Sequence, residues 1–351
     1  MLKLKEFWYI AAAASELGVR PIRRSVEGEP LALFRDEAGR AHALEDRCLH
    51  RGMALSAGRV ADGCLQCPYH GWRYDGAGAL AEVPALCEGE RLPRARVRSF
   101  PVVEQDGSLW VWLGDRAPLA DPFRFPHCSE PGWSSFFMHT RFEAPVEACL
   151  ENFLDVPHTI FVHPGLFRRG ATKPTRVRVH ERAEGALAEF VDEGELQGVG
   201  PRLLFPRGTE MRHTDQFILP SISRVDYLFG ETLGGDEAQG FVITSQCTQR
   251  EEFVVDVTTA ITWKLSRLRW AGPLVTAFLR WYCRRVIQQD VRMLAIQGRQ
   301  WREFGRTAWH TQADLLGQSI ARLRRQAVEA VSSGQIEAPR TANVRESFLR
   351  I

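Results

Sequence analysis

Two pairs of potential metal ligands lie close together in the N-terminal part of the chain. One residue separates Cys48 from His50 and two residues separate Cys67 from His70, in the pattern Cys-x-His-x16-Cys-x-x-His. A glycine follows each pair within two residues. Thiolates and imidazoles repeated at such short spacing are typical of a bound transition metal or an iron–sulfur cluster.

Three interpretations fit these four residues. A zinc finger of the Cys2His2 type places both cysteines before both histidines, whereas here each pair contains one of each. Four ordinary core residues are the second interpretation, and the ordered repetition of the pairs argues against coincidence. The third is a [2Fe–2S] cluster with two cysteines on one iron and two histidines on the other. Neutral histidines raise the reduction potential of such a cluster, which suits electron transfer.

The segments Cys48-Leu-His-Arg-Gly and Cys67-Pro-Tyr-His-Gly-Trp closely resemble the cluster-binding motif of Rieske proteins. The usual proline between the first cysteine and histidine is Leu49 here, a change that removes no ligand. The resemblance implies a Rieske cluster held by four residues, Cys48, His50, Cys67 and His70. Each loop should hold its cysteine inward and its histidine outward, and Trp72 is expected to pack beneath the second loop.

A second group of potential ligands begins about 80 residues later, in Asn152-Phe-Leu-Asp155-Val-Pro-His158-Thr-Ile-Phe-Val-His163. Two residues five apart on a regular helix point about 140° away from each other, so His158 and His163 would not share a face. Pro157 and Pro164 predict that the helix ends or kinks here, which lets the two rings converge. Taken alone, these residues are better explained as two ordinary, partly buried histidines at a helix end.

After a Rieske motif, the same stretch resembles the Asn-x-x-Asp-x-x-His-x-x-x-x-His pattern of the Rieske non-haem iron oxygenases. The resemblance implies that His158 and His163 bind a mononuclear Fe(II), and that a distant carboxylate completes a facial triad. The segment Gln288-Gln-Asp290-Val-Arg-Met-Leu294 resembles the late carboxylate motif of the family, which favours Asp290. Asp256 remains the competing candidate.

Two further residues of this motif receive expected roles. Asp155 lies three residues before His158, so both can share a helix face, and its carboxylate can accept a hydrogen bond from the free ring nitrogen. The resemblance implies that Asp155 also bridges to His70 of a neighbouring subunit, which requires a head-to-tail ring, usually a homotrimer. Asn152 is expected near the iron, where its amide orients a ligand or a water.

The pattern of predicted elements changes near residue 120. Residues 15–115 form short strand-like runs separated by turns such as Asp106-Gly107, which predicts a small all-β domain carrying the cluster loops. The runs include an alternating segment over residues 108–113. Prolines then concentrate between Pro118 and Pro131, so the Rieske domain is assigned to residues 1–120 and the iron-binding catalytic domain to residues 121–351.

The second domain is predicted to be an antiparallel sheet with helices against it, and the chain therefore to be α+β. A strand over residues 134–142 and a helix over residues 146–154 open it. Further strand-like segments lie at residues 176–179, 186–190, 216–219, 223–228, 240–248 and 254–265. Helices over residues 270–304 and 312–332 follow, with Gly305 ending the first. The resemblance implies a helix-grip, START-like domain.

The composition limits the classes of partner and compartment. The 45 basic and 43 acidic residues give a net charge of +2, which offers no electrostatic case for binding nucleic acid. Eight scattered cysteines do not form a secreted disulfide scaffold and fit a reducing cytoplasm. The apolar run Phe7–Ala14 is interpreted as the start of the first domain, with a signal peptide as the alternative. The 10-residue apolar run from Trp270 is too short to span a bilayer.

The resemblance implies the terminal component of an oxygenase that activates O2 to hydroxylate or to O- or N-demethylate a small apolar substrate with aromatic or polycyclic rings. The length is similar to that of the monooxygenase branch with the vanillate and dicamba demethylases and the pheophorbide-type oxygenases. The sequence has no flavin or nicotinamide fingerprint, so electrons from NAD(P)H should arrive through a separate ferredoxin or flavin reductase. The alternative is a Rieske electron-transfer or redox-sensing protein without oxygenase activity.

The segment from Trp263 to Tyr282 is aromatic and basic. The simpler interpretation is an amphipathic helix that packs on the sheet. The alternative hypothesis is a lid over a large apolar substrate with an acidic group, which would pair with Arg267, Arg269 or Arg280.

Overall fold

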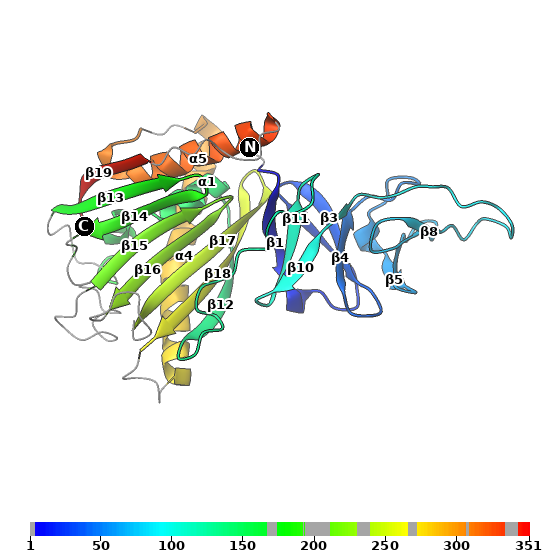
Figure 1. Cartoon of the computed structure of the whole chain (residues 1–351), viewed down its shortest axis with the longest axis horizontal. Helices are drawn as coiled ribbons and strands as arrows, with labels where there is room; N and C mark the ends of the chain where they lie inside the picture. Colours follow the sequence, from blue (N-terminus) through cyan, green and yellow to red (C-terminus); the bar gives the residue numbers. More distant parts are fainter. Residues whose placement is uncertain are drawn as a thin grey trace. The chain divides into compact units, whose positions relative to one another are not determined.

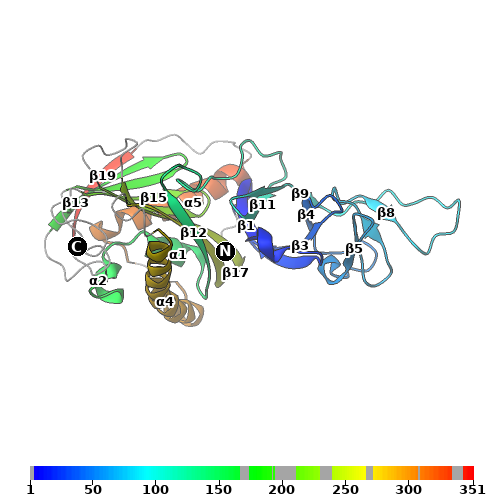
Figure 2. The ribbon, with the colours of Figure 1, turned by 90° about the horizontal axis from the view of Figure 1, so that it is seen from below.

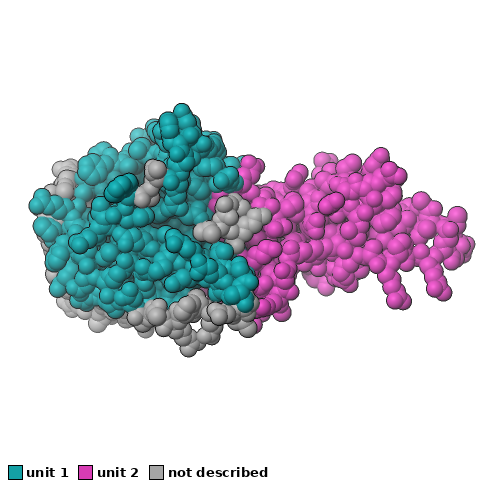
Figure 3. All heavy atoms as spheres, turned by 90° about the horizontal axis from the view of Figure 1, so that it is seen from above, with its two compact units in different colours: residues 1–4, 125–247, 252–351 teal, residues 5–124, 248–251 magenta. Residues whose placement is uncertain are grey.

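The computed structural model divides the chain into two compact units, which Figure 3 colours separately. The N-terminal unit contains Lys5–Arg124 together with Thr248–Glu251, and the C-terminal unit contains Met1–Leu4, Phe125–Cys247 and Glu252–Ile351. The structure describes residues 4–166, 174–191, 193, 211–229, 239–265, 272–306, 309–333 and 343–351. Among the described helices, none is long and apolar enough to cross a bilayer.

The N-terminal unit is built from three small antiparallel sheets (Figure 1). One has the order β1 (Phe7–Ala13), β11 (Ser108–Leu113), β10 (Val102–Gln105). The second has the order β2 (Ile22–Val26), β3 (Glu29–Arg35), β4 (Ala41–Glu45), β9 (Ser99–Phe100). The third has the order β5 (Arg59–Ala61), β6 (Cys64–Gln66), β7 (Arg73–Tyr74), β8 (Leu80–Glu82). The prediction of a small all-β region is confirmed.

Local sequence explains the hairpins of this unit, but the burial of β11 depends on the sheet. Asp106 and Gly107 both have positive φ, as a two-residue hairpin turn requires, and they join β10 to β11 as predicted. All six residues of β11 are buried, although the sequence predicted alternation. The strand lies between β1 and β10, which pair with both of its edges. Leu109, Val111 and Leu113 pack in one apolar cluster, and Trp112, which alternates to the other face, lies edge-on to Trp8.

The C-terminal unit contains one sheet of eight strands. The strand order is β12-β18-β17-β16-β15-β14-β13-β19, and the strand pairs with a described register are antiparallel. The bounds are β12 Ser134–Phe142, β13 Pro174–Arg182, β14 Gly185–Val191, β15 Met211–Ile218, β16 Ile222–Phe229, β17 Gln239–Glu251, β18 Val254–Lys264 and β19 Asn343–Arg350. This sheet and its helices confirm the α+β class.

The helices of the C-terminal unit pack against the sheet (Figures 1 and 2). They are α1 (Val146–Phe153), α2 (His158–Val162), α4 (Gly272–Phe304) and α5 (Leu315–Ser332). One apolar cluster joins residues of α1, α4 and α5 to inward-facing residues of the strands. The long helix is described from Gly272, since residues 270 and 271 of its predicted range lie outside the described residues, and it ends where predicted, because Gly305 takes φ +76°.

One glycine lets the long helix lie close to the edge of the sheet. A Cβ atom at Gly298 would stand 2.2 Å from the carbonyl oxygen of Glu143, directly after β12. A side chain therefore cannot be accommodated there without moving backbone. The close approach holds the preceding turns of α4, which carry Asp290, against the segment that leads into α1 and α2.

Candidate functional site

The cysteine and histidine pairs of the N-terminal unit lie on two loops of the same construction. The N–H of each cysteine donates to the carbonyl of the fifth residue after it, over 2.8 Å in both loops. The N–H of the glycine four residues after each cysteine donates back to the carbonyl of that cysteine, over 2.9 Å for Gly52 and 3.2 Å for Gly71. These glycines have φ +70° and +72°, which glycine adopts at little cost.

The two loops bury sulfur and expose imidazole. Cys48 and Cys67 are 1% and 2% exposed, whereas His50 and His70 are exposed, with ring centroids 4.4 Å apart. Burial raises the pKa of the Cys67 thiol, so a thiolate there needs the charge of a metal to stabilise it. Two buried sulfurs beside two solvent-facing rings fit a cluster with cysteine on one iron and histidine on the other.

Two aromatic residues complete this site in ways that the motif did not predict. Trp72 stacks on the His50 ring of the first loop, with centroids 4.8 Å apart and planes 2° apart, and it also packs against the buried cluster that contains Cys48 and Cys67. The Tyr74 hydroxyl lies 3.3 Å from Cys48 Sγ and accepts the N–H of Leu49 over 3.2 Å. In the sequence Tyr74 looks like an ordinary strand residue, and only the pairing of β6 with β7 turns it toward the first loop.

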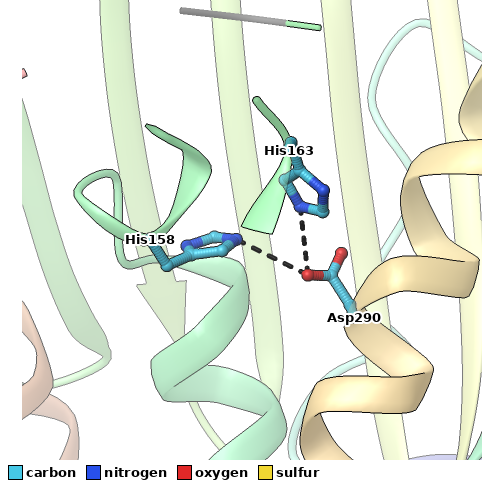
Figure 4. Close-up of side chains that lie close together, drawn as sticks. All are labelled: His158, His163 and Asp290. Atoms are coloured by element: carbon cyan, nitrogen blue, oxygen red, sulfur yellow. Dashed lines mark ion pairs between the residues drawn. The ribbon is translucent and has the colours of Figure 1, made fainter. Parts of the chain in front are cut away.

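The C-terminal unit brings His158, His163 and Asp290 together, as Figure 4 shows. Helix α2 is a single turn that begins at His158, after Pro157, and His163 follows its last residue with φ −119° and ψ 52°. Because His163 has left helical geometry, the two rings converge, with centroids 5.2 Å apart and planes at 76°. The predicted break in the helix is confirmed.

The third member comes from the long helix. Asp290 Oδ1 lies 3.1 Å from His163 Nε2 and 3.6 Å from His158 Nε2. One ligand atom from each residue lies within 4.8 Å of the other two. The competing candidate, Asp256, does not join this group, since its carboxylate pairs with Arg141 over 2.8 and 3.2 Å.

Charge and burial in this group suit a divalent cation. Asp290 is 5% exposed. Burial raises its pKa, but hydrogen bonds and charge from His158 and His163 outweigh burial and hold the pKa of Asp290 below its usual value. A buried ionised carboxylate between two imidazole nitrogens is the donor set of a non-haem iron site. The three residues therefore fit a mononuclear iron.

Hydrogen bonds to the far ring nitrogens orient both histidines. His163 Nδ1 lies 2.8 Å from Gln289 Oε1, to which it donates, so Nε2 is the nitrogen that faces Asp290 and that a metal would bind. His158 Nδ1 donates to the backbone carbonyl of Asp155. The Asp155 carboxylate, the expected acceptor, lies 3.8 Å away, so the backbone takes the role predicted for the side chain. Gln289 was not predicted, although it precedes Asp290 in the late carboxylate motif.

Asn152 lies beside the iron ligands, as expected. Its Nδ2 is 3.5 Å from Asp290 Oδ1. Its Oδ1 is buried and has no hydrogen-bond partner among the described residues. A buried acceptor left unpaired costs about 1–3 kcal/mol, which favours a donor at this position when the site is loaded.

A cavity of about 130 Å³ opens beside these residues. It lies between the inner face of the sheet and helix α4, and His158, His163 and Asp290 are part of its wall. Six of its other lining residues are Val225, Tyr227, Phe241, Ile243, Cys283 and Ile287. A largely apolar pocket with a few convergent polar groups is typical of a small-molecule site.

Where the structure describes it, the segment from Trp263 to Tyr282 packs in an apolar cluster and does not cover this cavity. Trp263, Val275 and Leu279 lie in one buried apolar cluster. The exposed Arg280 places its guanidinium 5.1 Å from the centroid of the Phe136 ring and does not line the cavity. Arg267 and Arg269 lie outside the described residues.

Comparisons with known proteins find a Rieske domain and relatives named as oxygenases. Residues 7–101 match the model of the Rieske [2Fe-2S] domain. The dicamba O-demethylase oxygenase component of Stenotrophomonas maltophilia is 38% identical over 229 residues, which are 64% of this chain and 63% of the relative. Chlorophyllide a oxygenase of Chlamydomonas reinhardtii is 36% identical over 196 residues, 54% of this chain and 29% of the relative. The chain thus spans less than two thirds of these curated relatives.

Solved structures share the fold over nearly the whole chain. Dicamba monooxygenase with non-heme iron and dicamba superposes with a TM-score of 0.76 at 22% identity, covering 95% of this chain and 100% of that chain. NdmA of Pseudomonas putida CBB5 with caffeine superposes with a TM-score of 0.74 at 22% identity, covering 94% and 93%. The chain thus contains a Rieske [2Fe-2S] domain over residues 7–101, is similar in sequence to these curated oxygenases, and shares the fold of dicamba monooxygenase.

Proposed function

We propose that this protein is the terminal oxygenase component of a Rieske non-haem iron oxygenase system. It hydroxylates, or O- or N-demethylates, an apolar ring-containing substrate and acts as a monooxygenase. The observation that carries this proposal is the convergence of His158, His163 and Asp290 beside an apolar cavity. Relatives named as a demethylase and an oxygenase support it.

In this proposal His158, His163 and Asp290 hold the mononuclear iron. When bound, such an iron supplies the reductive activation of O2. Gln289 and the Asp155 carbonyl keep the protons on the outer ring nitrogens, so both Nε2 atoms are free to ligate. Asn152 places an amide next to Asp290, and the apolar wall excludes water from the reacting substrate.

Cys48, His50, Cys67 and His70 hold the electron-transfer cluster. A separate ferredoxin or flavin reductase supplies the electrons, and His50 and His70 face solvent, where such a partner can approach. None of the eight cysteines, all of which the structure describes, forms a disulfide bond, which supports a reducing cytoplasm as the compartment.

Electron transfer from the cluster to the iron occurs between subunits of a homotrimer, from His70 of one copy to Asp155 of the next. The Asp155 side chain is 43% exposed, while the His158 side chain beside it is 16% exposed. The Asp155 carboxylate can therefore contact the His70 ring of another copy, while the Asp155 carbonyl contacts His158. A hollow of about 350 Å³ adjoins Asp155 and is lined also by Gln297, His310 and Leu315, which gives a second copy a surface to occupy.

The oxygenase and its alternative differ in metal content. An oxygenase binds about three iron atoms per chain, whereas a Rieske electron carrier binds about two. We expect about three by elemental analysis, together with product formation when peroxide and a panel of methoxy-aromatic, N-methyl, steroid-like and tetrapyrrole compounds are supplied. Two iron atoms per chain, or full product formation by His158→Ala, would contradict the proposed iron site.

The subunit arrangement has a separate test. A Cys67→Ser chain lacks the cluster and a His158→Ala chain lacks the iron, so each alone should be inactive with the reductase. If electrons cross between subunits, oligomers reassembled from a mixture regain part of the activity, because an intact cluster then lies beside an intact iron. Mixed oligomers with no activity would indicate transfer within one chain.

A further inference from the structure

Where the inner face of the sheet lines the cavity, its side chains change from polar to apolar in successive rows. Facing residues of β16 and β17 pair as Ser223 with Ser245, Val225 with Ile243, and Tyr227 with Phe241. All six line the cavity, and Thr259 and Ile261 of β18 line it too. The floor therefore has a row of hydroxyls next to rows of aliphatic and aromatic side chains.

The hydroxyl row has hydrogen-bonding capacity left over for a ligand. Ser245 Oγ and Thr259 Oγ1 lie 2.8 Å apart, and the two residues are 5% and 7% exposed. Two hydroxyls supply two O–H donors, and the bond between them uses one. The second donor can bind one acceptor atom in the cavity.

The hydroxyl row lies at the level of the iron ligands. Leu279 of α4 packs with Tyr227 and Phe241, at the aromatic end of the floor. Leu294, four turns further along the helix, packs in the cluster that contains Cys247, the next inward residue of β17 after Ser245. Asp290 lies between these two leucines, so the hydroxyls face the metal end of the cavity and the aromatic rings line the far end.

The cavity is poor in charge. Among the lining residues that the structure describes, the charged or readily charged side chains are the three proposed iron ligands. The Cys283 thiol is neutral, because burial raises its pKa to about 12. No basic side chain among these residues could compensate a carboxylate, so only an iron at the metal end could do so. A carboxylate held away from the metal would lose its hydration uncompensated, which is strongly unfavourable.

The size of the cavity matches a single ring. Its volume is about 130 Å³. An engineered apolar cavity of about 150 Å³ in another protein binds benzene. A single aromatic ring with short substituents is therefore a suitable probe.

We propose that this cavity selects a neutral single-ring substrate, whose one acceptor atom binds the Ser245–Thr259 hydroxyl pair while its apolar body lies on Val225, Ile243 and Ile261. The inference names the substrate class of the proposed oxygenase and rests on that function for the role of the cavity. Ser245 and Thr259 are then specificity-determining residues, because they orient the ring without touching the iron.

A pair of matched compounds tests the preference for a neutral ligand. 4-Methoxybenzamide and 4-methoxybenzoate have nearly the same shape and differ in charge. Their dissociation constants are measured by calorimetry on the metal-loaded protein, without O2 or reductant. We expect the amide to bind at least about tenfold more tightly, since it avoids the cost of burying a charge. Equal or tighter binding of the benzoate, or binding of neither compound, overturns the inference.

Variants of the hydroxyl pair test how the ligand is held. Ser245→Ala with Thr259→Val should weaken binding of the amide about 3- to 10-fold, the effect of one hydrogen bond. Ser245→Ala combined with Thr259→Ser, which keeps one hydroxyl, should restore part of the affinity. Thr258→Val is the matched control, because Thr258 is adjacent on β18, bonds to His139 and does not line the cavity. Unchanged affinity in the double variant overturns the assignment.

These measurements separate the inference from the proposed function. No turnover occurs without O2 and reductant, so the binding constants do not depend on the reaction. If the protein binds the amide as expected but holds two iron atoms per chain, the oxygenase proposal fails and the ligand preference stands. If the protein holds three iron atoms per chain and prefers the benzoate, the oxygenase proposal stands and the ligand preference fails.

Discussion

The two metal-binding regions are built from opposite kinds of contact. Each cluster loop closes on itself through backbone hydrogen bonds that span four or five residues. The iron site joins α2 to α4, and its hydrogen bond from His163 to Gln289 links residues 126 positions apart. A site made from local loops depends on a short motif. A site made from helices that are distant in the sequence depends on the whole sheet, which positions those helices side by side.

The two regions also place histidine differently. His50 and His70 are exposed, while His163 is 1% exposed and its ring nitrogens face Gln289 and Asp290. An exposed imidazole can exchange electrons with a partner, and a buried one needs a partner for each nitrogen. The difference matches an electron inlet in one region and a water-excluded reaction site in the other.

The largest expected effect is the loss of one metal site with full retention of the other. Asp290→Ala should reduce the iron content from about three to about two atoms per chain, abolish turnover and leave the visible spectrum of the cluster unchanged. Cys67→Ser should do the opposite, leaving about one iron and no cluster spectrum. Asp256→Ala is the control and should retain all the iron, since that carboxylate pairs with Arg141. Loss of the cluster spectrum in Asp290→Ala would show that the regions are not independent.

The next prediction concerns a third kind of histidine, buried and charged. His213 is 1% exposed and lies between Glu193, at 2.6 Å, and Asp215, at 3.0 Å. Burial lowers its pKa, but the two carboxylates outweigh burial and raise the pKa of His213 to about 9. Because the folded pKa lies above the unfolded value of about 6.5, this pairing stabilises the fold fully below pH 6.5. The stabilisation, about 3 kcal/mol, is lost as the pH rises through 9.

Urea unfolding of His213→Gln and the wild type measures this effect. The free energy of unfolding should differ by about 3 kcal/mol at pH 6, and the difference should shrink at pH 9.5. His180→Gln is the control, because the His180 side chain is 31% exposed beside Glu189, and it should cost less than about 1 kcal/mol. A difference for His213→Gln that does not change with pH would contradict the charged state.

A smaller effect is expected from the residue that orients His163. Gln289→Leu removes the acceptor for His163 Nδ1 and should weaken iron binding at the mononuclear site about 10- to 100-fold. Iron affinity is measured by competition with a chelator. Gln288→Leu is the matched control, since Gln288 is exposed on the same helix. A reduced cluster content in Gln289→Leu, or an unchanged iron affinity, would count against this role.

The smallest expected effect tests the cluster region alone. Where Cys48 is a thiolate ligand, its sulfur can only accept, so the Tyr74 hydroxyl would donate to it and stabilise the more negative, reduced cluster. Tyr74→Phe should therefore lower the midpoint potential by about 40 mV, the equivalent of about 1 kcal/mol for one electron. Tyr69→Phe, exposed beside His70, should leave the potential unchanged. Equal shifts in the two variants would remove the specific role of Tyr74.

Much of the organisation was readable from the sequence. The four cluster residues, the break in the helix at Pro157, the strand over residues 134–142 and the end of the long helix at Gly305 were all predicted. The cluster loops, the helix break and the helix end depend on contacts within a few residues, where glycine, proline and local spacing decide the backbone. The strand, by contrast, pairs with β18, far later in the chain. The choice of Asp290 over Asp256 was also predicted, but it needed the resemblance to a family.

Tertiary structure alone decided the rest. It tied the Asp256 carboxylate to Arg141, turned Tyr74 toward Cys48, brought Gln289 to His163 and aligned the Ser223–Ser245 row under the cavity. It also replaced the Asp155 carboxylate by its carbonyl as the partner of His158. These contacts join segments through strand register and helix packing, which short-range sequence patterns do not encode. The sequence by itself thus determined which residues can bind metal, and the sheet decided what surrounds them.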